Sequence, residues 1–235
     1  MRTHKVSIPI ADDEKVSGVV AIPADFQKRE TTGIILAHGA ANDMENPLIV
    51  FLSNGLAEAG FLSLRFNFLY KEKGRKAPDS QKKLGRTWKE VFQFLKVHPK
   101  FGTNKIVAAG KSMGGRVASQ MAADGELPAD GLIFLGYPLH PPGKKDQLRD
   151  AHLYKLQLPL LFFSGTRDTF CDLDLLRMVL GRMKSDWDLE VIDDGDHSLG
   201  LSKSADRTQD EVYAHVLRTM VDWMKTKINR PATKS

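Results

Sequence analysis

One serine of this 235-residue chain stands in a pattern that can support nucleophilic catalysis, Gly110-Lys-Ser-Met-Gly114. An apolar run precedes the pattern, and a segment with helical spacing follows it. Glycine two residues before and two after the serine is typical of a nucleophile elbow, a sharp strand-to-helix turn that exposes the hydroxyl at a sheet edge. The N–H of Met113 would then face the oxyanion that forms when Ser112 attacks a carbonyl carbon. The pattern predicts acyl transfer through Ser112.

The same residues also resemble the end of a nucleotide phosphate loop, Gly-x-x-x-x-Gly-Lys-Ser/Thr. That motif needs a glycine at position 105, where the sequence has Lys105. It also needs a glycine-rich turn, whereas residues 105–109 are mostly apolar and typical of a strand. We therefore exclude a nucleotide-hydrolysing loop at this position.

A serine nucleophile of this kind needs an acid later in the chain, at the end of another strand. Asp168 meets this requirement because it follows the apolar run 160–163 within Ser-Gly-Thr-Arg-Asp. Asp172 and Asp174 are rivals, but both fall in the first turn of the next expected helix, where acids stabilise the N-terminus. We therefore predict Asp168 as the acid.

The base should come after the last strand, because the expected chain order is serine, acid, histidine. His197 follows the run 189–192 and is the one histidine between the Asp168 loop and the terminal helix. The surrounding Asp193, Asp194 and Asp196 could form a metal site, but His197 brings no second histidine at ligand spacing. We predict His197 as the general base and expect no metal.

The second oxyanion donor should lie in the loop after the strand that precedes the first crossover helix. That loop reads His38-Gly39-Ala40. Gly39 permits a tight turn, and Ala40 offers an unobstructed N–H. We predict Ala40 N–H as the second donor and His38 as a brace of the loop that also borders the substrate.

These residues need a sheet that brings its strand ends together. Short apolar runs alternate with amphipathic segments, and runs rich in Ile, Leu, Val and Phe are typical of parallel strands covered on both faces. The first two runs alternate and predict an antiparallel hairpin that turns at 12–14. The predicted strands are Val6–Ile10, Val16–Ile22, Gly33–Ala37, Phe61–Phe66, Lys105–Ala109, Gly131–Leu135, Leu160–Phe163 and Leu189–Ile192.

Helical spacing is clearest at Trp88, Val91, Phe92 and Leu95. Together with the strands, this predicts a single α/β domain over 1–235 with an eight-stranded, mostly parallel sheet and helices on both faces. The other predicted helices cover 47–59, 113–122, 172–184 and the stripe from Val212 to Trp223, and residues 225–235 are expected to be a flexible basic tail.

Only 24 residues, 136–159, separate two strands where a lid would insert, which leaves room for a short helix near 148–156 but no lid domain.

Composition is ordinary for a globular protein, with 42% hydrophobic and 27% charged residues. The single cysteine, Cys171, excludes an internal disulfide and is expected to be a small, semi-buried filler near the site. The start of the chain has no apolar segment typical of a signal peptide, and no apolar run reaches the ~20 residues of a membrane helix. We expect a cytoplasmic protein.

In these motifs the chain resembles the α/β-hydrolase superfamily. It is more closely similar to the small predicted hydrolases related to testis-expressed protein thirty and to the α/β-hydrolase-like domain of the NSL-complex subunit. The resemblance implies the triad of Ser112, Asp168 and His197, and also that some relatives serve in complexes without catalysis. The matching stretches are Ile35–Ala40, Leu64–Phe68, Lys73–Asp79, Gly110–Arg116, Gly136–Pro141, Leu148–Asp150, Ser164–Asp168 and Gly195–His197.

The expected activity is cleavage of a carboxylic ester or thioester through an acyl-enzyme, without a cofactor. Two alternatives stay open. One is a lactonase like dienelactone hydrolase, a group of similar size that normally carries cysteine in place of Ser112. The other is a non-catalytic binding or scaffold protein that keeps the fold.

The substrate site is expected to be open and walled by Tyr70, Tyr137, Leu139 and His140. The chain carries a formal charge of +5, and the segment 71–89 alone holds eight basic and two acidic residues. A solvated helix face is the simpler interpretation of this segment. The functional one is that its early residues, Arg75 and Lys76, attract an anionic small-molecule substrate. We expect no nucleic-acid or membrane partner.

Overall fold

The computed structural model describes residues 1–11 and 13–229, and a single eight-stranded sheet runs through them. The strands occupy the positions expected from the apolar runs. They are β1 (Arg2–Ala11), β2 (Glu14–Ile22), β3 (Gly33–Ala37), β4 (Leu62–Phe66), β5 (Ile106–Lys111), β6 (Gly131–Leu135), β7 (Leu160–Gly165) and β8 (Trp187–Ile192).

The strand order is β1-β2-β4-β3-β5-β6-β7-β8. β1 and β2 form the predicted antiparallel hairpin, and β2 pairs with β4 in the antiparallel sense. All pairs from β4 to β8 are parallel. The prediction of an eight-stranded, mostly parallel sheet is therefore confirmed, and the carboxyl ends of β3, β5, β6, β7 and β8 meet at one edge.

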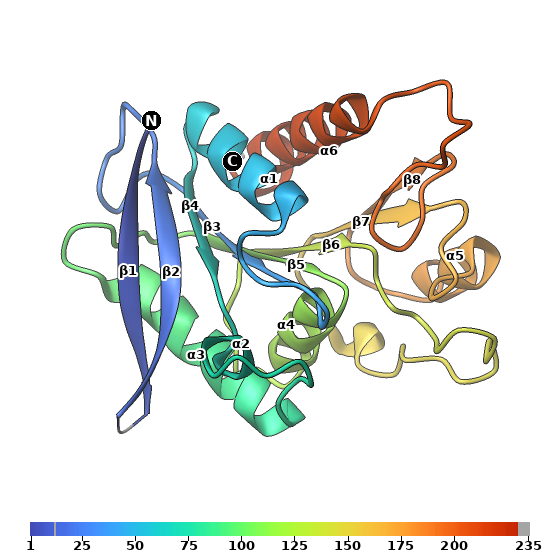
Figure 1. Ribbon diagram of the computed structural model, residues 1–235, viewed down its shortest axis with the longest axis horizontal. Helices are drawn as coiled ribbons and strands as arrows, with labels where there is room; N and C mark the ends of the chain where they lie inside the picture. Colours follow the sequence, from blue (N-terminus) through green and yellow to red (C-terminus); the bar gives the residue numbers. More distant parts are fainter. Residues whose placement is uncertain (12, 230–235) are drawn as a thin grey trace, which may run out of the picture.

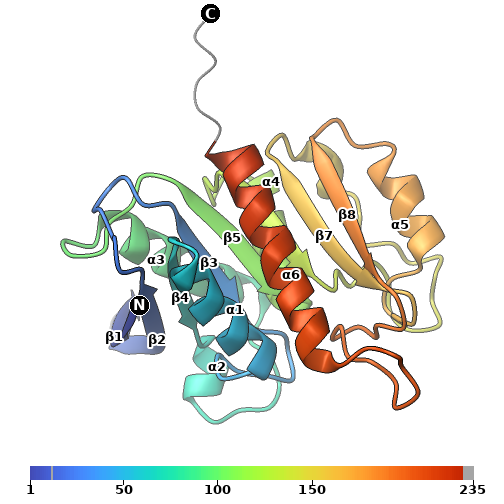
Figure 2. The same cartoon turned by 90° about the horizontal axis from the view of Figure 1, so that it is seen from above.

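Helices cover both faces of the sheet, as predicted (Figure 1). α1 and α6 lie on one face, and α3 and α4 lie on the other; Figure 2 shows α1 and α6 crossing the first face. The helices are α1 (Pro47–Glu58), α2 (Leu69–Glu72), α3 (Gln81–Val97), α4 (Met113–Ala123), α5 (Leu173–Leu180) and α6 (Gln209–Trp223).

Two apolar cores hold these layers together. The side chains of a strand alternate between the faces, so β5 sends Ile106 and Ala108 to the α3–α4 side and Val107 and Ala109 to the α1–α6 side. Because both faces are covered, β3, β4, β6 and β7 are buried along their whole length. This is why β3 and β6 read as continuous apolar runs, whereas β4 also buries Ser63 and Arg65.

Two expectations need correction, and a third concerns residues that the structure does not describe. The segment 148–156 forms only one 3₁₀ turn, Leu153–Lys155. Residues 225–228 of the expected flexible tail continue α6 as a helical turn, Met224–Ile228, because Ile228 packs into the core beside α6. Residues 230–235 of that tail, and residue 12 of the predicted hairpin turn, lie outside the described residues. Among the helices that are described, none is both long and apolar enough to cross a bilayer.

Candidate active site

The carboxyl edge of the sheet brings together the three residues predicted to form a triad. The Nε2 atom of His197 lies 2.8 Å from the Oγ atom of Ser112. Its Nδ1 atom lies 2.9 and 2.8 Å from the two carboxylate oxygens of Asp168. Since a carboxylate only accepts hydrogen bonds, Nδ1 carries the proton and Nε2 is free to accept the proton of the serine hydroxyl.

Ser112 occupies a strained turn between β5 and α4. Its backbone angles, φ 49° and ψ −114°, lie in a region that non-glycine residues rarely adopt. The neighbouring glycines make the turn possible. A Cβ at Gly110 would overlap the backbone of Gly115, and a Cβ at Gly114 would lie 2.7 Å from the carbonyl oxygen of His38. The glycines are therefore required by close packing of backbone on backbone.

The loops that carry the acid and the base are joined to each other. Arg167 N donates to Gly195 O at 2.8 Å, and Thr166 N donates to Ile192 O at 3.0 Å. A Cβ at Gly165 would overlap the carbonyl group of Gly195. This contact sets the spacing between the two loops, and with it the meeting of the acid and the base.

The acidic residues around the histidine hold its loop in shape. Asp196 Oδ1 accepts from Gly200 N at 2.9 Å. Asp194 accepts from Ser202 N at 2.8 Å and forms an ion pair with Arg167 at 2.9 Å. Asp194 and Asp196 are thus occupied by loop-stabilising bonds.

Asp168 is buried and well supported. Its side chain has no exposed surface, and its Oδ1 atom also accepts from Phe170 N at 2.8 Å. The ring of Phe170 packs over the imidazole of His197 with centroids 4.4 Å apart. His197 is thus held by contacts with Ser112, Asp168 and Phe170. Its side chain keeps 15% of its surface exposed, so a reactant can still reach it.

The loop 38–40 lies against the nucleophile. A Cβ at Gly39 would lie 3.6 Å from Ser112 Cβ. Within the described chain, neither Ala40 N nor Met113 N donates to another backbone or side-chain group. Both amides therefore have no intramolecular acceptor, and their role as oxyanion donors stays a prediction.

His38 stabilises this loop through two hydrogen bonds to the backbone. It is fully buried, its Nε2 atom accepts from Phe68 N at 3.1 Å, and its Nδ1 atom donates to Gly39 O at 2.8 Å. Burial lowers the pKa of His38 to about 4, which keeps the ring neutral. Because the ring has no exposed surface, we correct its assignment as a substrate-binding residue; the expectation that it braces the loop agrees with these bonds.

The depressed pKa of His38 predicts a pH-dependent stability. An unfolded histidine takes up a proton below pH ~6.5, whereas the folded ring resists it down to about pH 4, so the unfolded state binds more protons in this window. Stability is therefore complete above pH ~6.5 and is lost as the pH falls. The contribution is up to about 1.4 kcal/mol per pH unit. Urea unfolding at several pH values between 4 and 7 should show a shallower slope for His38→Gln than for the wild type.

His4→Gln is the matched control, because His4 lies exposed on β1. It should keep the wild-type slope. Equal slopes for wild type and His38→Gln would contradict the assignment of a neutral, buried ring.

Three aromatic or imidazole side chains expected to wall the site are buried. The hydroxyl of Tyr70 donates to Ala40 O at 2.9 Å, and burial raises the pKa of Tyr70 to about 12. The hydroxyl of Tyr137 donates to Arg149 O at 2.7 Å. His140 uses both ring nitrogens, accepting from Asp172 N at 3.0 Å and donating to its neighbour's carbonyl. We therefore correct these assignments: the three side chains support the loops around the site.

Leu139, the fourth expected wall, is also fully buried, within the α3–α4 core. Arg75 is partly exposed, but its guanidinium is paired with Asp79 at 2.5 Å. Lys73 is likewise paired, with Glu14. The basic segment continues as an exposed face of α3. This agrees with the simpler interpretation, a solvated helix face.

Two residues near the triad were not foreseen. Phe170 covers His197, and no periodicity marks an isolated aromatic residue in a loop. Lys111 is only 5% exposed although it precedes the nucleophile. Burial lowers the pKa of its ammonium, while the charges of Asp196 and Asp168 oppose the shift. In the sequence, only the position of Lys111 inside the elbow motif could have indicated that it lies near the triad.

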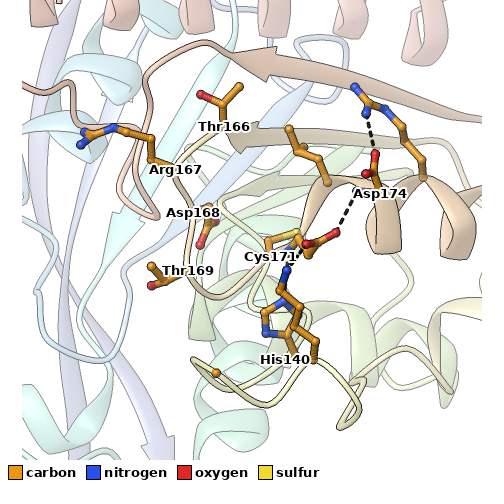
Figure 3. Close-up of a pocket in the computed structure, with 12 residues that line it drawn as sticks. His140, Thr166, Arg167, Asp168, Thr169, Cys171 and Asp174 are labelled. Carbon is orange, nitrogen blue, oxygen red and sulfur yellow. Dashed lines mark hydrogen bonds and ion pairs between the residues drawn. The ribbon is translucent and has the colours of Figure 1, made fainter.

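A hollow of about 590 Å³ lies beside the acid (Figure 3). Asp168, Cys171 and His140 border it, and its cations are engaged in ion pairs such as Lys145 with Asp172. Cys171 itself is buried, and burial raises the pKa of its thiol to about 12. This agrees with the expectation of an inert filler.

Comparison with known proteins places this arrangement in context. Residues 30–225 match the family model described as alpha/beta hydrolase domain. Several solved structures are similar in fold at 17 to 19% identity. They include dienelactone hydrolase from Anabaena variabilis (19% identity, TM-score 0.74, covering 96% of this chain and 98% of that one) and Est1E from Butyrivibrio proteoclasticus bound to ferulic acid (17%, 0.77, 96% and 100%). A third is a serine hydrolase without lid from Xanthomonas campestris (18%, 0.68, 98% and 96%).

Proposed function

The chain belongs to the alpha/beta hydrolase domain family, and from this membership and the geometry of its sheet edge we propose that it is a serine hydrolase of carboxylic esters or thioesters. The observation that carries the proposal is the continuous hydrogen-bonded row from Ser112 through His197 to Asp168, with each link at 2.8 to 2.9 Å. Such a row is the arrangement that activates a serine hydroxyl.

In the first half of the reaction, Ser112 Oγ bonds to the acyl carbon and His197 Nε2 takes the hydroxyl proton. The carbonyl oxygen becomes an oxyanion that accepts from Met113 N–H and Ala40 N–H. When the tetrahedral species collapses, the bond from carbon to the leaving oxygen or sulfur breaks. His197 returns its proton to that leaving group, and the acyl-enzyme remains.

In the second half, water attacks the ester of Ser112 while His197 accepts a proton from it. The acid product leaves as the proton returns to Ser112 Oγ. Throughout, Asp168 holds the imidazole in the required tautomer and stabilises it when it is charged. Every proton and electron pair moves among this chain, the substrate and water.

The two alternatives, a non-catalytic scaffold and a lactonase, make different demands on the residues of the site. A non-catalytic scaffold has no need of a strained serine, a free oxyanion loop and a buried acid, which supports the catalytic assignment. Lactone cleavage would use the same triad on a cyclic ester. We further propose that the described residues act as one catalytic domain on a small acyl substrate, and that the protein is cytoplasmic.

The direct test combines a substrate panel with covalent labelling. We expect hydrolysis of p-nitrophenyl esters and acyl thioesters of short chain length to exceed that of long-chain lipids, since the 24 residues between β6 and β7 are too few for a lid domain. A fluorophosphonate should add its mass to the peptide that contains Ser112. A lactone in the panel tests the alternative substrate class. Absence of both turnover and labelling between pH 6 and 9 would leave the non-catalytic scaffold as the better account.

A further inference from the structure

Another hollow lies at the opposite edge of the sheet from Ser112. It encloses about 440 Å³, and the residues that border it are Arg2, His4, Ile22, Phe26, Lys100 and Phe101. Arg2 pairs with Ile22 across the hairpin, and Ala21 pairs with Ser63 near the start of β4. The hollow is therefore at the amino edge of the parallel strands, whereas the triad occupies their carboxyl edge.

The floor of this hollow is apolar. Ile22 and Phe101 are almost completely buried, and Phe26 is half-buried against the α3–α4 core. The ring of Phe101 stacks on the ring of His98 with centroids 4.3 Å apart, and its centroid lies 5.8 Å from that of His4. The floor can thus accept a flat apolar group against aromatic side chains.

Hydrogen bonds fix the two loops that carry this floor. The Nδ1 atom of His98 accepts from Lys100 N and from Phe101 N, each at 3.2 Å. Arg29 N donates to Gly102 O at 2.9 Å and so joins the loop after β2 to the loop after α3. Because both loops are already held in place, little conformational entropy is lost when a ligand enters the hollow.

The rim of the hollow is cationic. Arg2, His4 and Lys100 are exposed. Across residues 1–11 and 13–229, none of the three forms an ion pair with a carboxylate. Asp25 precedes Phe26 in the chain, but it does not border the hollow. The rim therefore presents nitrogen donors and positive charge, which are the groups that bind carboxylates and phosphates.

We propose that this hollow binds an amphiphilic anion, a compact apolar group such as an aromatic ring that carries a carboxylate or a phosphate. The ring lies against Phe26 and Phe101, and the anionic group accepts hydrogen bonds from Arg2 and Lys100. Both parts are needed, because exposed single charges contribute little by themselves and the ring gains its affinity from leaving water. The site is separate from the triad, so this inference goes beyond the proposed function and does not depend on it.

Two matched pairs of probes test the two parts of the ligand. Benzoate and benzamide share a ring, but only benzoate is charged. Phenyl phosphate and inorganic phosphate share a charged group, but only phenyl phosphate has a ring. We expect benzoate and phenyl phosphate each to bind at least about tenfold more tightly than its partner. Two-dimensional NMR of the full chain measures the Kd, and the amide signals of Lys100 and Phe101 should shift while those of Met113 and His197 stay in place.

Substitutions on the rim and the floor assign the binding to this hollow. Arg2→Gln and Lys100→Gln should each weaken phenyl phosphate binding by about 3- to 10-fold. Phe26→Ala should weaken benzoate and phenyl phosphate alike, since both lose the contact with the floor. Lys5→Gln is the matched control, because side chains alternate along a strand and Lys5 therefore lies on the other face of β1 from Arg2. It should leave every Kd unchanged.

The outcomes separate this site from the catalytic one. Equal Kd values in Arg2→Gln and Lys5→Gln, or benzamide binding as tightly as benzoate, would overturn the proposal. Shifts confined to the signals of Met113 and His197 would also overturn it. Ester hydrolysis should be the same in the wild type and in Arg2→Gln, so the failure of the anion site and the failure of the proposed function are read from different measurements.

Discussion

Replacing Ser112 with alanine should lower kcat for the best ester by about 10⁴- to 10⁶-fold and abolish fluorophosphonate labelling. The hydroxyl lost is the one that His197 Nε2 faces at 2.8 Å. The residual rate would come from the free amides of Met113 and Ala40, which still stabilise an oxyanion. Steady-state kinetics and intact-protein mass spectrometry check both parts.

The chain provides a matched control for this variant. Ser119 Oγ also lies 2.8 Å from a histidine nitrogen, His152 Nε2, but it donates to Arg116 O inside α4 and is fully buried. Burial also lowers the pKa of His152 to about 4. Ser119→Ala should therefore keep activity within a few-fold of the wild type. Wild-type turnover in Ser112→Ala would contradict the assignment of the nucleophile.

His197→Gln should cost nearly as much, and the double variant with Ser112→Ala should be no worse than the single one. Residues that act as one unit give losses that do not add. Additive losses would mean that the two side chains act separately, in spite of the hydrogen bond between them.

Replacing Gly165 with alanine should destabilise the fold by about 3 kcal/mol and lower activity in the protein that remains folded. A Cβ at this position overlaps the carbonyl group of Gly195 and lies 2.8 Å from Asp196 O. These obstacles are backbone atoms of the loop that carries His197, so neither can swing away like a flexible side chain. Chemical denaturation measures the stability, and kcat measures the displacement of the base.

Gly85→Ala is the control for a glycine without such a constraint. It lies inside α3, and its nearest obstacle is the flexible side chain of Met121 at 3.4 Å. Alanine is favoured over glycine in a helix by up to about 1 kcal/mol, so this variant should equal or exceed the wild type in stability. If Gly165→Ala were as stable as Gly85→Ala, this would contradict the claim that the contact between Gly165 and Gly195 sets the spacing of the two loops.

The sequence was sufficient for the parts of the site that depend on local pattern and chain order. The spacing of Gly110, Ser112 and Gly114 predicts a tight turn, because glycine stands at the two positions where a larger side chain would clash with the backbone. The runs before Asp168 and His197 are strands, β7 fully buried and the edge strand β8 partly buried. Parallel strands necessarily present their carboxyl ends at one edge. These features are local, so they could be predicted and then found in place.

Which side chains face the substrate was decided only by the tertiary structure. Tyr70, Tyr137 and His140 look like site walls in the sequence, yet each is buried with its polar atoms bonded to backbone groups. Conversely, Phe170 lies 27 positions from His197 and covers its ring only when the loops after β7 and β8 come together. Burial and charge pairing depend on contacts between distant segments, and no spacing along one chain encodes which face of a loop will meet water.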